Sequence, residues 1–191
     1  VATGIQDPLN MRAERSELEE SRRHYAVISH TWELPWYKSQ KGLLGRVLGG
    51  WSVSGVWTLT SGRLFLPSLT AVAGGVAARP NVVGDWYLEP DKRSLFAYFN
   101  TAAFARPASW TYGNSGKWVI RGPGSIDLSA FALKEVRVFE QARLQLRLEA
   151  FNAMNHMNLG GFNTQLGNRA FGQINDVGAP RYLQIGGKFM W

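Results

Sequence analysis

The residues of this chain best suited to binding chemistry are aromatic and amide side chains in residues 62–124. An aromatic ring offers a flat apolar face on which a ligand ring can stack, and an amide fixes the ligand by hydrogen bonds. This combination suits sugars and peptides. The same rings can instead form a small core of the loop itself, which is the commoner role of any single one of them. The candidate ligand-binding residues are Trp86, Tyr87, Trp110, Tyr112, Asn114 and Trp118.

A second candidate group is a run of polar side chains that alternates with leucines. It consists of Arg143, Gln145, Arg147 and Glu149, and Asp127 lies in the polar phase of an earlier segment. On neighbouring strands these side chains would share one face. They would either contact a ligand or another part of the protein, or form a solvated wall whose opposite charges balance. We also expect Asp127 to pair with one of the two arginines across the strands.

Motifs for catalysis or metal binding do not stand out. The zinc-protease pattern H-E-x-x-H does not occur, and the three histidines are not at metal-pair spacing. The string GWSVS at residues 50–54 lacks the last glycine of a nucleophile elbow, and YGNSGKW at 112–118 lacks the spacing of a phosphate-binding loop. Cysteine is absent, which excludes disulfides and cysteine-ligated metals. The sequence therefore predicts no enzymatic activity, no cofactor and no metal.

Charge and hydropathy argue against two further classes of protein. The 191 residues carry a formal net charge of +7, but the basic residues are spread along the chain, with only short pairs such as Arg22-Arg23. A nucleic-acid partner is therefore not expected, because nucleic-acid-binding proteins gather their basic residues into a patch. No run of about eighteen apolar residues occurs, so no transmembrane helix is predicted. The chain does not begin with Met and carries no signal-peptide pattern, which we interpret as a processed chain or part of a longer one.

Alternation of apolar and polar side chains identifies the elements that must position these candidate residues. Successive side chains of a strand point to opposite faces of its sheet. In the clearest segment, residues 142–150, Leu144, Leu146 and Leu148 would face lipid in a membrane barrel, while the charged residues between them would face its lumen. The predicted strands lie near residues 22–34, 51–62, 125–137, 142–154 and 181–191.

The connections between the predicted strands alternate in length. About sixteen residues join the first pair and about four join the third and fourth strands, whereas the long connections span residues 62–124 and 155–180. Outer-membrane barrels have short turns at the periplasmic side and longer loops outside the cell. We therefore predict an all-β fold, an antiparallel transmembrane β-barrel with long extracellular loops. A soluble β-sandwich would give the same alternation within single strands.

Six stretches of the chain resemble the C-terminal end of TonB-dependent outer-membrane receptors. The resemblance is closest to the Oar-like group, whose members carry an N-terminal carboxypeptidase-regulatory-like domain. It covers about residues 7–191 and depends on the order and spacing of the stretches rather than on any one of them. The stretches are RRHYAVISHTWELPW, LLGRVLGGWSVSGVWTLTSG, YFNTAAF, RGPGSIDLSAFALKEV, RLQLRLEAFNAMNHMNLGGFNTQLGNRAFGQI and GAPRYLQIGGKFMW.

The resemblance implies that residues 1–191 are about the last five strands of a barrel of about 22 strands with a plugged lumen. The plug and the regulatory-like domain would precede this chain and are not in it. The implied function is TonB-dependent uptake of a bulky nutrient, such as a carbohydrate or a peptide, across the outer membrane of a Gram-negative bacterium. Phe189 and Trp191 would form the terminal signal that the barrel-assembly machinery reads. The other implied partners are membrane lipid, the plug, the TonB complex and an unknown extracellular nutrient.

Two alternative functions fit the same residues. The first is a structural or adhesive outer-membrane barrel that transports nothing, and the second is a soluble β-sandwich binding module. A plug domain encoded upstream would favour transport over adhesion. Solubility of the chain as a single species without detergent would favour the sandwich.

Overall fold

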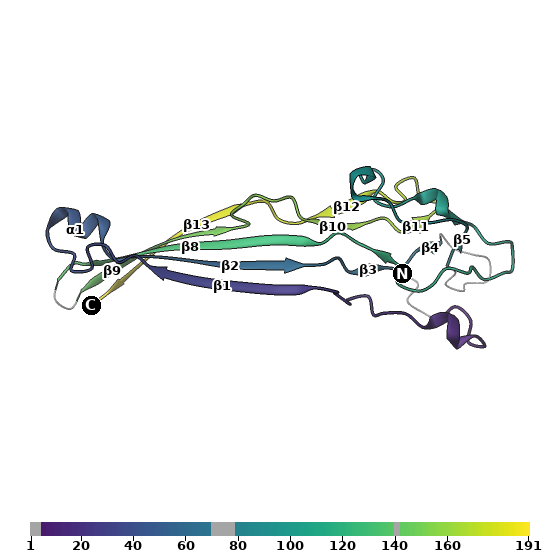
Figure 1. Ribbon diagram of the computed structural model, residues 1–191, viewed down its shortest axis with the longest axis horizontal. Helices are drawn as coiled ribbons and strands as arrows, with labels where there is room; N and C mark the ends of the chain where they lie inside the picture. The colour runs from purple at the N-terminus through teal and green to yellow at the C-terminus, as the bar shows by residue number, and fades with distance from the viewer. Residues whose placement is uncertain (1–4, 70–78, 140–141) are drawn as a thin grey trace. The chain divides into compact units, whose positions relative to one another are not determined.

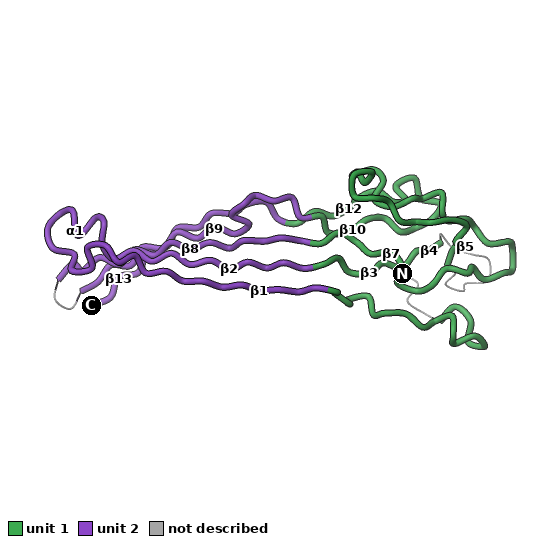
Figure 2. Tube along the Cα trace, in the orientation of Figure 1, with its two compact units in different colours: residues 1–23, 61–124, 159–178 green, residues 24–60, 125–158, 179–191 purple. Residues whose placement is uncertain are grey.

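The computed structural model describes residues 5–69, 79–139 and 142–191. It divides into two compact units, shown in different colours in Figure 2. We call residues 24–60, 125–158 and 179–191 the sheet unit, and residues 1–23, 61–124 and 159–178 the loop unit. Each unit is therefore assembled from three separate stretches of the chain.

The sheet unit contains one five-stranded sheet in the order β1-β2-β8-β9-β13, and every neighbouring pair is antiparallel (Figure 1). Each long strand lies within the segment in which alternation predicts it. The all-β, antiparallel fold class is thus confirmed. The five strands are β1 (Tyr25–Glu33), β2 (Trp51–Thr60), β8 (Ser125–Arg137), β9 (Arg143–Phe151) and β13 (Tyr182–Met190).

The strand registers give the sheet one mainly apolar and one mainly polar face. Leu148 of β9 lies opposite Ala132 of β8 and Ile185 of β13, and Glu149 lies opposite Phe131 and Gln184. Because side chains alternate along each strand, these pairs fix which residues share a face. The apolar face carries Ala26, Ile28, Trp32, Trp51, Val53, Trp57, Leu59, Ile126, Leu128, Ala130, Ala132, Val136, Leu144, Leu146, Leu148, Ala150, Leu183, Ile185 and Phe189.

Two polar residues interrupt the apolar face, and the structure explains both. His30 lies opposite Gly55, where an added Cβ would come within 2.6 Å of the histidine ring, so the missing side chain makes room for the imidazole. Lys134 extends its amine to the carbonyl oxygens of Val47 (3.1 Å) and Gly49, and its charge lies 5.4 Å from the centre of the Trp51 ring. The lysine thus keeps its apolar stem on the face, while two carbonyl oxygens and the Trp51 ring interact with its charge.

The two shorter connections of the sheet unit are compact. Between β1 and β2 the chain forms one short helix, α1 (Gly42–Leu48), whose Leu43 and Leu44 side chains are 81% and 67% exposed. Apolar side chains exposed on a short helix suit the interface of a lipid bilayer. Between β8 and β9 the Val138 amide donates to the Ala142 carbonyl at 2.9 Å, while residues 140 and 141 lie outside the described part of the chain. In the described residues, no helix is both long and apolar enough to cross a membrane.

The loop unit consists of short strands and turns that pair residues far apart in the sequence. Strand β3 pairs with β7, β5 with β6 and β10 with β12, all antiparallel, whereas β4 and β11 are parallel. The two long predicted loops are therefore folded together, apart from residues 70–78, which the structure does not describe. The elements are η1 (Met11–Glu14), β3 (Leu64–Phe65), β4 (Ser68–Leu69), β5 (Asn81–Val82), η2 (Pro90–Lys92), η3 (Thr101–Ala103), β6 (Phe104–Ala105), β7 (Ile120–Arg121), β10 (Leu159–Phe162), β11 (Gln165–Leu166) and β12 (Ile174–Val177).

Aromatic rings form the core of the loop unit. Phe99 is 2% exposed, and its ring centre lies 5.7 Å from that of Phe104, 5.3 Å from that of Phe162 and 5.2 Å from that of Phe171. Such edge-to-face and tilted contacts add stability beyond the burial of apolar area. The buried members of this core besides Phe99 are Phe65, Tyr98, Ala103, Phe104, Ile120 and Phe162. A loop unit with its own core holds its surface groups in fixed positions.

A buried ion pair ties the N-terminal segment to the rest of the loop unit. The Arg79 guanidinium donates to both carboxylate oxygens of Glu14, at 2.9 and 3.0 Å, and the two side chains are only 5% and 7% exposed. Burial by itself would raise the pKa of Glu14, but the hydrogen bonds from Arg79 and from the Gln6 amide, with the charges of Arg79 and Lys117, lower it overall. The Gln6 side chain also donates to Gly113 and accepts from the Arg79 amide.

Acidification should release this N-terminal segment. Folding lowers the pKa of the Glu14 carboxyl, so the charged carboxylate stabilises the folded state at any pH above the pKa that glutamate has in the unfolded chain. This stabilisation is lost as the pH falls through the lowered pKa of the folded state. We expect amide protection in residues 5–14 to be constant above about pH 5 and to fall below about pH 4, the usual range for glutamate. Hydrogen exchange expressed as protection factors measures this.

The substitution Glu14→Gln should produce the same loss of protection at neutral pH. It leaves the Arg79 charge buried without its counter-charge, which costs about 3–5 kcal/mol. Glu20→Gln is the matched control, because the Glu20 side chain is 71% exposed in its contact with Arg22. Equal protection in both variants would show that the buried pair does not hold the segment.

Candidate ligand-binding pocket

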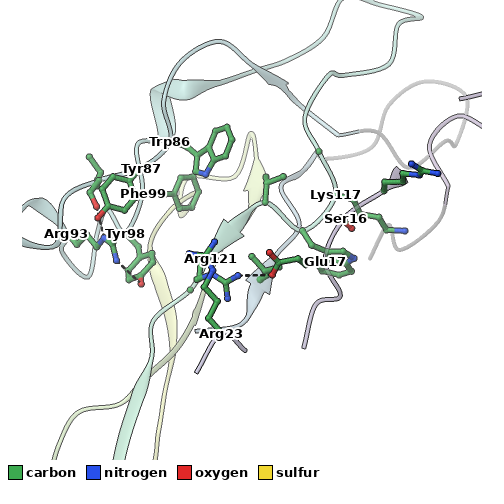
Figure 3. A pocket seen from close by; sticks show the side chains of 17 residues that line it. Ser16, Glu17, Arg23, Trp86, Tyr87, Arg93, Tyr98, Phe99, Lys117 and Arg121 are labelled. Atoms are coloured by element: carbon green, nitrogen blue, oxygen red, sulfur yellow. Dashed lines mark hydrogen bonds and ion pairs between the residues drawn. The ribbon is translucent and has the colours of Figure 1, made fainter. Parts of the chain in front are cut away.

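A pocket of about 560 Å³ lies within the loop unit (Figure 3). Its wall comes from four stretches, namely the segment that precedes β1, Leu64 of β3, the connection between β5 and β6, and the segment around β7. The volume is in the range of pockets that hold small molecules. The side chains in the wall are mainly aromatic and basic, and they include Arg15, Glu17, Arg23, Trp86, Tyr87, Arg93, Tyr98, Phe99, Lys117, Trp118 and Arg121.

The aromatic part of the wall combines buried rings with one exposed ring. Tyr98 and Phe99 are 7% and 2% exposed because they also belong to the core. Trp86 packs on the core residue Phe104 with 6.1 Å between the ring centres, whereas Tyr87 is 54% exposed. The core thus supports the wall from behind and leaves the Tyr87 ring accessible.

Arg93 is held between two tyrosines. Its Nε donates to the Leu88 carbonyl at 2.8 Å and one Nη donates to the Tyr98 hydroxyl at 3.3 Å. Its guanidinium also lies 5.1 Å from the Tyr87 ring centre and 5.0 Å from that of Tyr98. Burial raises the pKa of Tyr98 although the nearby Arg93 charge opposes this, so the phenol stays protonated at neutral pH. Figure 3 shows these three side chains together.

The charged part of the wall is strongly basic. Arg121 donates to Glu17 at 2.9 Å and to the Gly62 carbonyl at 3.0 Å, and Lys117 lies 3.7 Å from Glu14. Within the described residues, the guanidinium groups of Arg15 and Arg23 have no hydrogen-bond or ion-pair partner. The wall contains four more cationic than anionic side chains, namely the cations Arg15, Arg23, Arg93, Lys117 and Arg121 against the single carboxylate Glu17.

The structure brings together half of the predicted ligand-binding residues. Trp86, Tyr87 and Trp118 line the pocket. Trp110 and Tyr112 do not line it and are 85% and 48% exposed. Asn114 is also outside the pocket.

Asn114 instead joins its own segment to strand β5 of the loop unit. Its side-chain oxygen accepts from the Val82 backbone amide at 2.7 Å, and its backbone amide donates to the Asn81 side-chain oxygen at 3.0 Å. The basic residues of the pocket were missed by sequence reasoning, because they come from stretches up to about a hundred residues apart. The only signals were the net charge and the Arg22-Arg23 pair.

The second candidate group lies on the polar face of the sheet. Arg143, Gln145, Arg147 and Glu149 share this face with Asp127, as alternation predicts. The ion pairs join Arg143 to Glu135 at 3.3 Å and Arg147 to Glu149.

The expected pairing of Asp127 with an arginine of β9 is wrong. Arg147 lies opposite Leu133, which is six residues, or roughly 20 Å, along β8 from Asp127. Asp127 instead accepts a hydrogen bond from Ser129 at 3.3 Å. Asp127 and Arg147 therefore share the polar face, but the strand register places them too far apart to form an ion pair.

The last residues of the chain present aromatic rings. Phe189 is on the apolar face and is 50% exposed, and Trp191 is 92% exposed, with 6.0 Å between their ring centres. In the part of the chain that the structure describes, no three histidine, cysteine or acidic residues are grouped so that they could hold a metal ion.

Comparison with protein families decides the class of protein. A family model described as an outer membrane beta barrel domain matches residues 1–184. The chain belongs to this family. A search of curated proteins and a search of solved structures each found no significant match.

Membership of the outer membrane beta barrel family indicates that the sheet lies in a lipid bilayer. The protein is located in the outer membrane of Gram-negative bacteria. An apolar face that continues across five strands is what a barrel wall presents to lipid, and the polar face is what it presents to its lumen. The soluble β-sandwich alternative is therefore not retained, and the described residues of the sheet unit form only one sheet.

Proposed function

We propose that this outer-membrane barrel domain is part of a TonB-dependent receptor of the Oar-like group, which takes up a bulky nutrient. The observation that carries the proposal is the loop unit, which folds around its own aromatic core and holds a pocket of about 560 Å³. A barrel that only anchors a protein in the membrane needs no such unit. A receptor does, because capture of a dilute solute requires groups held in fixed positions.

The sheet is consistent with this role and with further strands. Within the described residues, β1 and β13 each have one edge without a partner strand. Closed outer-membrane barrels have at least eight strands, since open edges in a bilayer leave backbone groups without hydrogen bonds. We propose that additional strands complete the barrel, that a plug fills its lumen, and that the TonB complex acts through that plug.

The remaining parts of the proposal concern orientation, assembly and chemistry. The loop unit faces the outside of the cell, and α1 and the β8–β9 turn face the periplasm. Phe189 and Trp191 form the signal for the barrel-assembly machinery. The domain binds and conducts its ligand without catalysis, cofactor or metal.

Growth experiments in the source bacterium test transport. We expect deletion of the gene to abolish growth on at least one oligosaccharide or peptide too large for porins, and reintroduction of the gene to restore it. Deletion of tonB in the complemented strain should abolish growth on that substrate again. Unchanged growth on every substrate, together with loss of attachment to surfaces, would instead establish an adhesive barrel.

A further inference from the structure

We infer that the pocket of the loop unit binds an acidic oligosaccharide through a segment of about two sugar rings. The inference deepens the proposed function by naming the substrate class. It rests on that function only for transport of the ligand after the pocket has bound it. It is carried by the charge, the hydrogen-bonding capacity and the ring faces of the pocket wall.

The charge of the wall selects an anionic ligand. Its cations exceed its carboxylates by four, and the guanidinium groups of Arg15 and Arg23 have no partner in the described residues. A guanidinium presents a planar fork of donors that matches a carboxylate or sulfate with two parallel hydrogen bonds. Both arginines belong to the segment before β1, so they reach the pocket from the same stretch of chain.

The other side of the pocket supplies ring faces. Tyr87 is 54% exposed, and Arg93 lies against its ring at 5.1 Å, which fixes the ring in place. Trp118 also belongs to the wall. A rigid aromatic face can hold the apolar C–H face of a sugar with little loss of conformational entropy. Figure 3 shows Tyr87 and Arg93 on one side and Arg23 and Arg121 further along the wall.

The balance of donors and acceptors favours a sugar acid over a peptide. The wall offers many cationic donors and one carboxylate acceptor, Glu17, which already accepts from Arg121. A peptide brings one amide donor for each carbonyl acceptor, and its amides would find few side-chain acceptors in this wall. A sugar acid brings carboxylates, which only accept, and hydroxyls, which can do either. Its size also fits, since two sugar rings have a volume that a pocket of about 560 Å³ can hold.

Binding to the purified full-length receptor in detergent tests the inference. The probes are a disaccharide of two uronic acids, the neutral disaccharide of the corresponding hexoses, and an acidic dipeptide with an aromatic side chain. We expect the acidic disaccharide to bind at least tenfold more tightly than either of the others. This preference should weaken as salt is added, because exposed charges are screened.

Substitutions locate the binding to the pocket. Arg15→Gln and Arg23→Gln should each weaken binding of the acidic disaccharide roughly tenfold, since each removes a charge-assisted hydrogen bond. Binding of the neutral disaccharide should fall much less, because its hydroxyls make weaker hydrogen bonds to a guanidinium than a carboxylate does. Arg12→Gln is the matched control, because Arg12 is exposed on the same segment and does not line the pocket. Heat-modifiable migration in gels verifies that each variant is folded.

Several results would overturn the inference. They are equal affinity for the acidic and neutral disaccharides, tighter binding of the dipeptide, or the same loss of affinity in Arg12→Gln as in Arg23→Gln. Failure here with TonB-dependent growth intact would mean that the receptor transports another class of substrate. Success here without any growth defect on deletion would mean that the pocket captures acidic sugars for a barrel that does not transport them.

Discussion

Replacing Leu148 by arginine should prevent assembly of the barrel. Leu148 is 47% exposed on the apolar face, and the two residues directly opposite it in register, Ala132 and Ile185, are both apolar. A basic residue on the lipid face near the bilayer midplane costs roughly 2–4 kcal/mol. We expect the full-length variant to lose most of its folded, heat-modifiable form in outer-membrane fractions.

The structure selects this position over its neighbour Leu146. Leu146 lies opposite Lys134, whose amine reaches the carbonyl groups of Val47 and Gly49, so an arginine there has a nearby polar region to reach. Gln184→Arg is the matched control, since Gln184 lies opposite Glu149 on the polar face. Normal assembly of Leu148→Arg, or poor assembly of Gln184→Arg, would reverse the assignment of the lipid and lumen faces.

Replacing Phe99 by alanine should unfold the loop unit while the sheet still assembles. Phe99 is 2% exposed and contacts three other rings of the core. Truncation of a fully buried phenylalanine costs about 3–5 kcal/mol through lost burial and the cavity that remains. We expect protease added to intact cells to cleave the loop unit much faster in Phe99→Ala, with the amount of heat-modifiable protein unchanged.

Phe96→Ala provides the comparison for this experiment. Phe96 lies three residues earlier in the same turn, and it is 76% exposed, so its truncation removes little buried area. Cleavage of this variant should match that of the unaltered protein. Equal resistance of Phe99→Ala would mean that the loop unit does not depend on its aromatic core.

The strands and their faces could be predicted from sequence because they depend on a local property. Side chains alternate with a period of two along any strand. The sequence alone therefore places Leu144, Leu146 and Leu148 on one face of the sheet and Arg143, Arg147 and Glu149 on the other, before any strand pairing is known. The hairpin of β8 and β9 also follows, since only a few residues separate the two strands.

Contacts between distant stretches were decided only by the tertiary structure. Glu14 and Arg79 are 65 residues apart, and Arg23 and Arg93 reach one pocket from different stretches of the loop unit. No periodic pattern encodes such pairs, because they depend on how long loops close and on which rings share a core. For the same reason, aromatic composition indicated a binding loop but could not separate Tyr87, in the pocket, from Trp110, outside it. Sequence periodicity thus determined the barrel wall, and the packing of the aromatic core determined which side chains form the pocket.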